Sequence, residues 1–138
     1  MSFYPVESGW EIKYFRKKAS TAFAVNSLVG ESSALDTIEP AIAADAALVG
    51  IVIKEVTSAD ADYAENTEIA VPIPSVKGAL MEGPVGTGTI AVTDVGNTYD
   101  LKDHISVDQT GTTYNAVRLY KRLSATLGQW TIEAAELR

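Results

Sequence analysis

The stretch Met81–Asp94 (MEGPVGTGTIAVTD) places glycines at positions 83, 86 and 88, so it could in principle bind phosphate. A Walker-type loop needs a lysine directly after its last glycine, and here Gly88 is followed by Thr89. A dinucleotide-binding fingerprint needs a third glycine at position 91, which is alanine, and then a helix, whereas TIAVTDV favours a strand. We therefore interpret these glycines as turn residues, because glycine adopts positive φ without steric cost.

A second candidate is an acidic segment whose side chains carry the oxygen ligands that calcium prefers. Its members are Asp60, Asp62, Glu65, Asn66 and Glu68. The spacing of an EF-hand is absent, since position 64 is alanine and no glycine supplies the sharp turn. We interpret the segment as a solvated acidic loop and keep a calcium site as the alternative.

Covalent catalysis has few residues to draw on. The chain has no cysteine and no Gly-x-Ser-x-Gly motif, and His104 is its single histidine. His104 stands near Asp103 and Asp108, but neighbours in a strand point to opposite faces, so we expect a surface histidine. We predict that the protein is not an enzyme and that it needs neither a cofactor nor a metal.

The 138 residues fit a single β domain over residues 19–138, preceded by an N-terminal arm or first strand over residues 1–18. The net charge of −7 disfavours nucleic acid as a partner. Two short basic runs, Arg16–Lys18 and Lys121–Arg122, are interpreted as solvated strand edges or contacts to an acidic partner. The N-terminus lacks the pattern of a signal peptide, and no apolar run is long enough to span a bilayer, so we expect no membrane partner.

Short strands separated by turn residues dominate the pattern. Alternating apolar residues predict strands over 9–17 and 22–30, and a β-branched run predicts another over 47–56. Pro72 and Pro74 stand two apart, which favours an edge strand or an irregular extended arm because their missing amides point the same way. The alanine-rich segment 39–48 and the C-terminal segment 132–138 could be helical. The fold class we predict is mostly β, a small antiparallel β-barrel or sandwich with an extended N-terminal arm and at most short helices.

The order of these segments resembles the small structural proteins of tailed bacteriophages, the capsid decoration (cement) and auxiliary head proteins. The segments concerned are AFAVNSLV from Ala22, ALVGIVIKEVT from Ala47, DADYAENTEIAV from Asp60 and VGNTYDLKD from Val95, followed by the last glycine–aromatic hairpin. The resemblance spans roughly Ala22 to Ala134 and is one of pattern and order.

The resemblance implies a β-barrel-like virion protein without catalysis, made in the host cytoplasm and located on the capsid exterior. Its implied partners are the major capsid protein, whose neighbouring subunits it would bridge and stabilise, and further copies of itself as a homotrimer. A head–tail connector or tail component is one alternative. A carbohydrate-binding β module that stacks sugars on Trp10 or Trp130 is another.

The N-terminal segment lies outside the resemblance and is rich in aromatic residues, which dominate interface energetics. We predict that it forms an interface arm through Phe3, Tyr4, Pro5, Trp10, Tyr14 and Phe15. An arm of this kind could add a strand to an exposed sheet edge of a capsid subunit or of the next copy. The alternative is that Trp10, Ile12 and Tyr14 form a first core strand.

Overall fold

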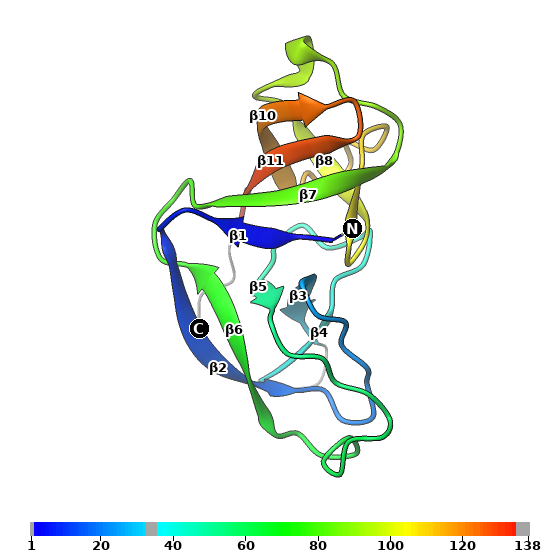
Figure 1. The fold of residues 1–138 in the computed structure, drawn as a ribbon. Coiled ribbons are helices and arrows are strands. Elements are labelled where there is room, and N and C mark those ends of the chain that lie inside the picture. The colour runs from blue at the N-terminus through cyan, green and yellow to red at the C-terminus, as the bar shows by residue number, and fades with distance from the viewer. Residues whose placement is uncertain (1, 33–35, 135–138) are drawn as a thin grey trace.

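The computed structural model describes residues 2–32 and 36–134, which form eleven strands and one short 3-10 helix (Figure 1). The elements are β1 Tyr4–Val6, β2 Trp10–Lys17, β3 Ser27–Glu31, β4 Thr37–Pro40, β5 Gly50–Val52, β6 Glu68–Pro74, β7 Leu80–Thr87, η1 Val92–Asp94, β8 Thr98–Asp103, β9 Ser106–Asp108, β10 Val117–Ser124 and β11 Leu127–Ile132. The predicted class, mostly β with at most short helices, is therefore confirmed.

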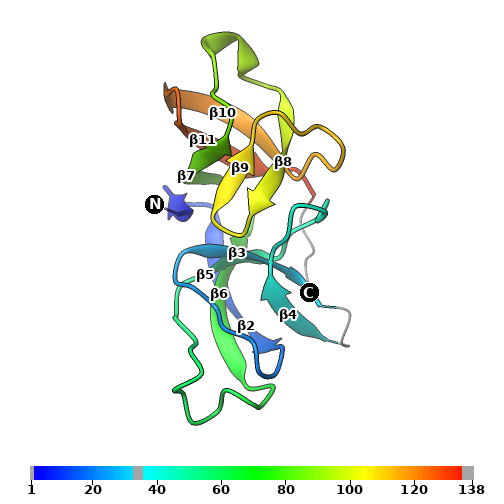
Figure 2. The ribbon, with the colours of Figure 1, turned by 90° about the vertical axis from the view of Figure 1, so that its right-hand side faces the viewer.

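A five-stranded barrel makes up one half of the molecule, in the order β7-β11-β10-β8-β9 with β9 returning to β7 (Figure 2). The barrel closes because the second half of β7 pairs with β9, on the same edge of β7 whose first half pairs with β1. The first residues of β7, Leu80–Glu82, pair with β1, and its end, at Val85 and Thr87, pairs with β9. The other edge of β7 pairs with β11.

The second sheet has the order β5-β3-β4-β2-β6. Residues 1–18, expected to be an arm or a first strand, supply β1 to the first sheet and β2 to the second. β2 is antiparallel to β6 over Trp10–Arg16 and parallel to β4 at Arg16 and Lys17. β6 ends the sheet order, which confirms the edge strand predicted from Pro72 and Pro74.

The two halves share apolar contacts. One buried cluster fills the barrel around Trp130 and Leu119, and it also takes in Leu28 and Ile51 from the second sheet. The other cluster lies under the second sheet and includes Phe15, Phe23 and Ile38 together with residues of β5 and β6. Side chains from β3 and β5 therefore enter both clusters and connect the barrel with the second sheet.

The turn predicted for the glycines of the opening stretch is confirmed for Gly88, which follows β7 with a φ of +81°, and is wrong for the other two. Gly83 and Gly86 lie inside β7, and glycine is required there because other groups approach the backbone closely. A Cβ on Gly83 would lie 2.2 Å from Cδ1 of Phe3, and one on Gly86 would lie 2.5 Å from Oγ of Ser106. The strand expected after Gly88 is also wrong, since η1 forms there.

Two further expectations need correction. The segment 39–48 is not a helix: β4 continues to Pro40, and turns follow in which the Asp45 carboxylate accepts the backbone N–H of Ile42 at 2.9 Å. Ala41 and Leu48 are buried there, so tertiary packing takes the place of a helical face. Residues 135–138 of the predicted C-terminal helix lie outside the described residues, and β11 continues to Ile132.

Candidate functional site

The predicted interface residues divide into buried and exposed positions. Phe3 is fully buried, its backbone N–H donates to Asn26 O at 3.0 Å, and its ring packs on Gly83. Phe15 is buried in the cluster under the second sheet. These two rings stabilise the fold and offer no surface to a partner.

Tyr4 and Pro5 lie on β1, where they pair with Glu82 and Met81 of β7. Because β1 is paired with β7 along one of its edges, Tyr4 and Pro5 are fixed on the barrel and do not form a free arm. Tyr4 keeps 41% of its surface exposed, and its hydroxyl donates to the Glu82 carboxylate. That hydrogen bond is the main reason why the pKa of Tyr4 lies above its usual value, with smaller contributions from burial and from the charge of Glu82. Tyr4 is thus an exposed phenol held in a fixed orientation.

Strand β2 is exposed on both of its faces over Glu11–Tyr14. Ile12 and Tyr14 share one face and are 58% and 66% exposed, although both are large apolar side chains. Glu11 and Lys13 lie on the other face, with 3.8 Å between a Glu11 oxygen and Lys13 Nζ. This strand combines exposed apolar surface with alternating charge, which is unusual for the interior of a sheet.

The two tryptophans have different surroundings. Trp130 is fully buried, its Nε1–H donates to Gly83 O at 3.0 Å, and its ring contacts Tyr99 edge-on with centroids 6.3 Å apart. It therefore cannot stack on a sugar. Trp10 is half-buried against the barrel core and donates its Nε1–H to Leu80 O at 2.9 Å.

The basic run Arg16–Lys18 is not a solvated edge throughout, because Lys17 is fully buried. Its ammonium donates to the backbone oxygens of Asp62, Tyr63 and Glu65 at 2.8, 3.3 and 2.5 Å. The sequence interpretation was wrong here because the run looks uniformly polar. Only the arrival of the 62–65 loop over β2 provides carbonyl partners that make a buried ammonium tolerable.

The acidic segment is organised by bonds within the chain. The Asp60 carboxylate accepts the backbone N–H of Thr57 at 3.1 Å, and the Asp62 carboxylate accepts the Thr67 hydroxyl at 2.5 Å. The Thr67 bond is the main reason why the pKa of Asp62 is lowered. No group of three or more metal-ligating side chains occurs among residues 2–32 and 36–134. His104 is half-buried and its backbone oxygen accepts from Leu28 N at 2.8 Å.

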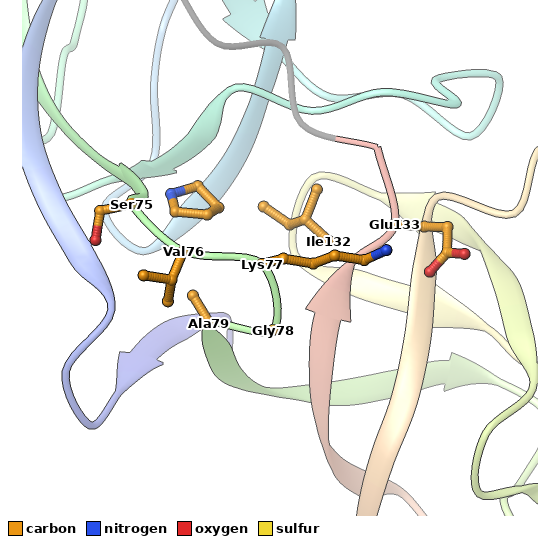
Figure 3. A pocket seen from close by; sticks show the side chains of 8 residues that line it. Ser75, Val76, Lys77, Gly78, Ala79, Ile132 and Glu133 are labelled. Atoms are coloured by element: carbon orange, nitrogen blue, oxygen red, sulfur yellow. The ribbon is translucent and has the colours of Figure 1, made fainter.

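A pocket of about 330 Å³, which the sequence did not indicate, opens between the β6–β7 connection and the end of β11 (Figure 3). Its lining residues are Pro74, Ser75, Val76, Lys77, Gly78, Ala79, Ile132 and Glu133. The Lys77 side chain extends toward Glu133 in Figure 3. Glu133 is already bonded to Arg118 at 2.7 and 3.0 Å, and this bond is the main cause of its lowered pKa. The pocket is therefore lined by both apolar and charged side chains.

Comparison with protein-family models, with curated proteins and with solved structures found no match for this chain. In the described part of the chain, no helix has the length and apolar character needed to cross a membrane.

Proposed function

We propose that this chain is a virion structural protein that binds the outside of a phage capsid and stabilises it by bridging neighbouring major capsid protein subunits. The proposal rests on the segment order described above and on a surface suited to attachment. The net charge of the chain, −7, suits contact with basic patches of a capsid shell and repels the packaged genome.

The observation that carries the proposal is the exposure of Tyr4 on a strand that is fixed in the fold. The neighbouring Phe3 is buried, β7 pairs with β1, and Glu82 accepts the Tyr4 hydroxyl. An aromatic side chain held in place before binding loses little conformational entropy on contact, and such residues provide much of the energy of protein interfaces. Attachment to a repeating shell then gains further strength when several copies engage together.

The test is co-sedimentation of the purified protein with capsids of its own source that lack it. We expect saturable binding at a fixed ratio to the major capsid protein, and that ratio reports the symmetry position. The variant Tyr4→Ser is expected to weaken binding about 5- to 30-fold, the range for an aromatic contact worth roughly 1–2 kcal/mol. Tyr120→Ser is the matched control, because Tyr120 is also exposed but lies on β10 of the barrel.

Absence of binding by the unchanged protein would overturn the proposal. Recovery from tails, or as a free ring in mass photometry, would identify a connector or tail component instead. A change in Trp10 fluorescence on a glycan panel would favour the carbohydrate-binding alternative, since Trp10 is the partly exposed tryptophan. Binding that is equal for Tyr4→Ser and for the control would keep the capsid role but move the contact away from β1.

A further inference from the structure

Strand β2 has one edge that the described residues leave largely unpaired. On one side it pairs with β6 without interruption from Trp10 to Arg16. On the other side the described chain provides β4, and only at Arg16 and Lys17. Figure 1 shows β2 running beside β6 at the left margin of the view. Among residues 2–32 and 36–134, no strand pairs with residues 10–15 on this side, so they form a free strand edge within the described part of the chain.

The backbone groups that face this free edge follow from the hydrogen bonds at the two ends of β2. Lys17 N–H donates to Thr67 O and Gly9 O accepts from Ser75 N, so odd-numbered residues bond toward β6. Lys18 N–H donates to Ile38 O on the opposite side. Because strand residues alternate, the N–H and C=O groups of Trp10, Ile12 and Tyr14 point to the free edge.

The prolines of β6 agree with this assignment. Pro72 is opposite Ile12 and Pro74 is opposite Trp10. A proline has no N–H to donate, so it fits a pair whose backbone groups point away from each other.

The side chains along this edge are complementary to themselves. In an antiparallel pairing of two copies centred on Ile12, Glu11 of each copy lies opposite Lys13 of the other. Ile12 then faces Ile12, and Trp10 faces Tyr14, on the opposite face of the new ribbon. Opposite charges and aromatic or β-branched pairs are the cross-strand combinations that stabilise a sheet.

Space along the edge selects the same register. In the pairing centred on Ile12, the strand of the second copy needs only its residues 10–14. Gly9 of the second copy, whose φ is +108°, then turns that chain away before it reaches the position beside Arg16 where β4 of the first copy begins. A pairing centred on Lys13 would bring the second Trp10 beside Arg16, where Thr37 of β4 already lies. It would also place Lys13 opposite Lys13.

We propose that two copies of this chain associate through antiparallel pairing of their β2 strands over Trp10–Tyr14, about a twofold axis at Ile12. The three hydrogen-bonded pairs, Ile12 with Ile12 and Trp10 with Tyr14 twice, each exchange two backbone bonds. The contact is short, so the dimer is weak and reversible. This association needs no capsid, and it predicts a dimer where the phage resemblance implied a trimer.

The first test is sedimentation equilibrium of the full chain up to a concentration of about 1 mM, chosen for a small interface. We expect the molar mass to rise from 14.7 kDa toward twice that value. A mass that stays at 14.7 kDa, or one that rises to a trimer, overturns the proposal. Neither outcome depends on capsid binding, so failure here leaves the capsid proposal intact.

The register is tested by Ile12→Cys, since the chain contains no other cysteine. Facing residues of a hydrogen-bonded pair have Cα atoms about 5.5 Å apart, within the range of a disulfide. With oxidised glutathione as the electron acceptor, the two thiols lose two protons and two electrons to form the disulfide, and two molecules of reduced glutathione are released. We expect cross-linked dimer from Ile12→Cys and much less from Val25→Cys, an exposed control away from β2. Equal cross-linking of both variants overturns the register.

Charge exchange provides an independent test. Glu11→Lys and Lys13→Glu each place like charges opposite one another twice, and each is expected to raise the dissociation constant about tenfold. The double exchange restores the complementarity and is expected to restore the dimer. If the double variant dimerises no better than the single variants, Glu11 does not face Lys13 and the proposed pairing is wrong.

Discussion

Removal of the Phe3 ring tests whether the N-terminus belongs to the core. Phe3 is fully buried in the barrel cluster, and its ring lies on Gly83 so closely that a Cβ there would be 2.2 Å from Cδ1. Truncating a buried phenylalanine to alanine costs about 3–5 kcal/mol, a large share of the roughly 5–15 kcal/mol that stabilises an ordinary domain. We expect Phe3→Ala to lower the free energy of unfolding by this amount.

The reverse change, Gly83→Ala, inserts a methyl group where the ring already lies. Gly83 cannot move aside easily, because it pairs with Gly128 of β11 and its carbonyl accepts from the Trp130 indole. Overpacking of this kind costs about 1–3 kcal/mol. In the double variant the methyl group enters the space left by the ring, so the cost of Gly83→Ala is expected to fall close to zero. The resulting coupling energy is then about 1–3 kcal/mol.

Urea denaturation followed by far-ultraviolet circular dichroism and by tryptophan fluorescence measures all four members of this cycle. Val92→Ala is the control, because Val92 is 73% exposed and its truncation is expected to change stability by less than about 0.5 kcal/mol. A loss below about 1 kcal/mol for Phe3→Ala would show that the N-terminus is a free arm in solution. Equal costs of Gly83→Ala with and without the Phe3 ring would show that the two residues do not touch.

Three further perturbations probe the polar contacts. Lys17→Met removes the buried ammonium and nearly keeps the length of the side chain. We expect faster amide hydrogen exchange confined to residues 58–66, because the ammonium bonds to the backbone of this loop. Unchanged exchange would contradict the role of Lys17 in holding the loop. Asp100→Ala removes a buried carboxylate that accepts three backbone N–H groups, those of Thr113, Tyr114 and Asn115, and is expected to cost about 2–4 kcal/mol in chemical denaturation. The Arg118 bond lowers the pKa of the Glu133 carboxyl below its ordinary 4.5, so the stabilisation is present above pH 4.5 and is lost as the pH falls through the folded-state pKa. Unfolding free energies measured across this range are expected to fall less steeply for Glu133→Gln than for the unchanged chain, and identical slopes would refute the linkage.

Local pattern in the sequence was sufficient for the class of the fold and for several of its elements. Alternation predicted β2, paired prolines predicted that β6 is an edge strand, and the order of short strands predicted a β-barrel or sandwich. These features depend on neighbours within a few residues: alternation sets which side chains share a face, and a proline lacks its amide in any context.

Contacts between distant segments determined the rest. The sequence shows an aromatic residue near the N-terminus and a glycine 80 positions later, but only the pairing of β1 with β7 brings Phe3 onto Gly83. Likewise, Lys17 reads as a surface residue until the 62–65 loop supplies its carbonyl partners. The free edge of β2 also arises only in the folded chain, because β4 pairs with β2 only at Arg16 and Lys17, the last two residues of β2. Whether a side chain is buried, and whether a strand edge is left unpaired, depends on which distant segment packs against it. The local pattern of residues does not contain that information.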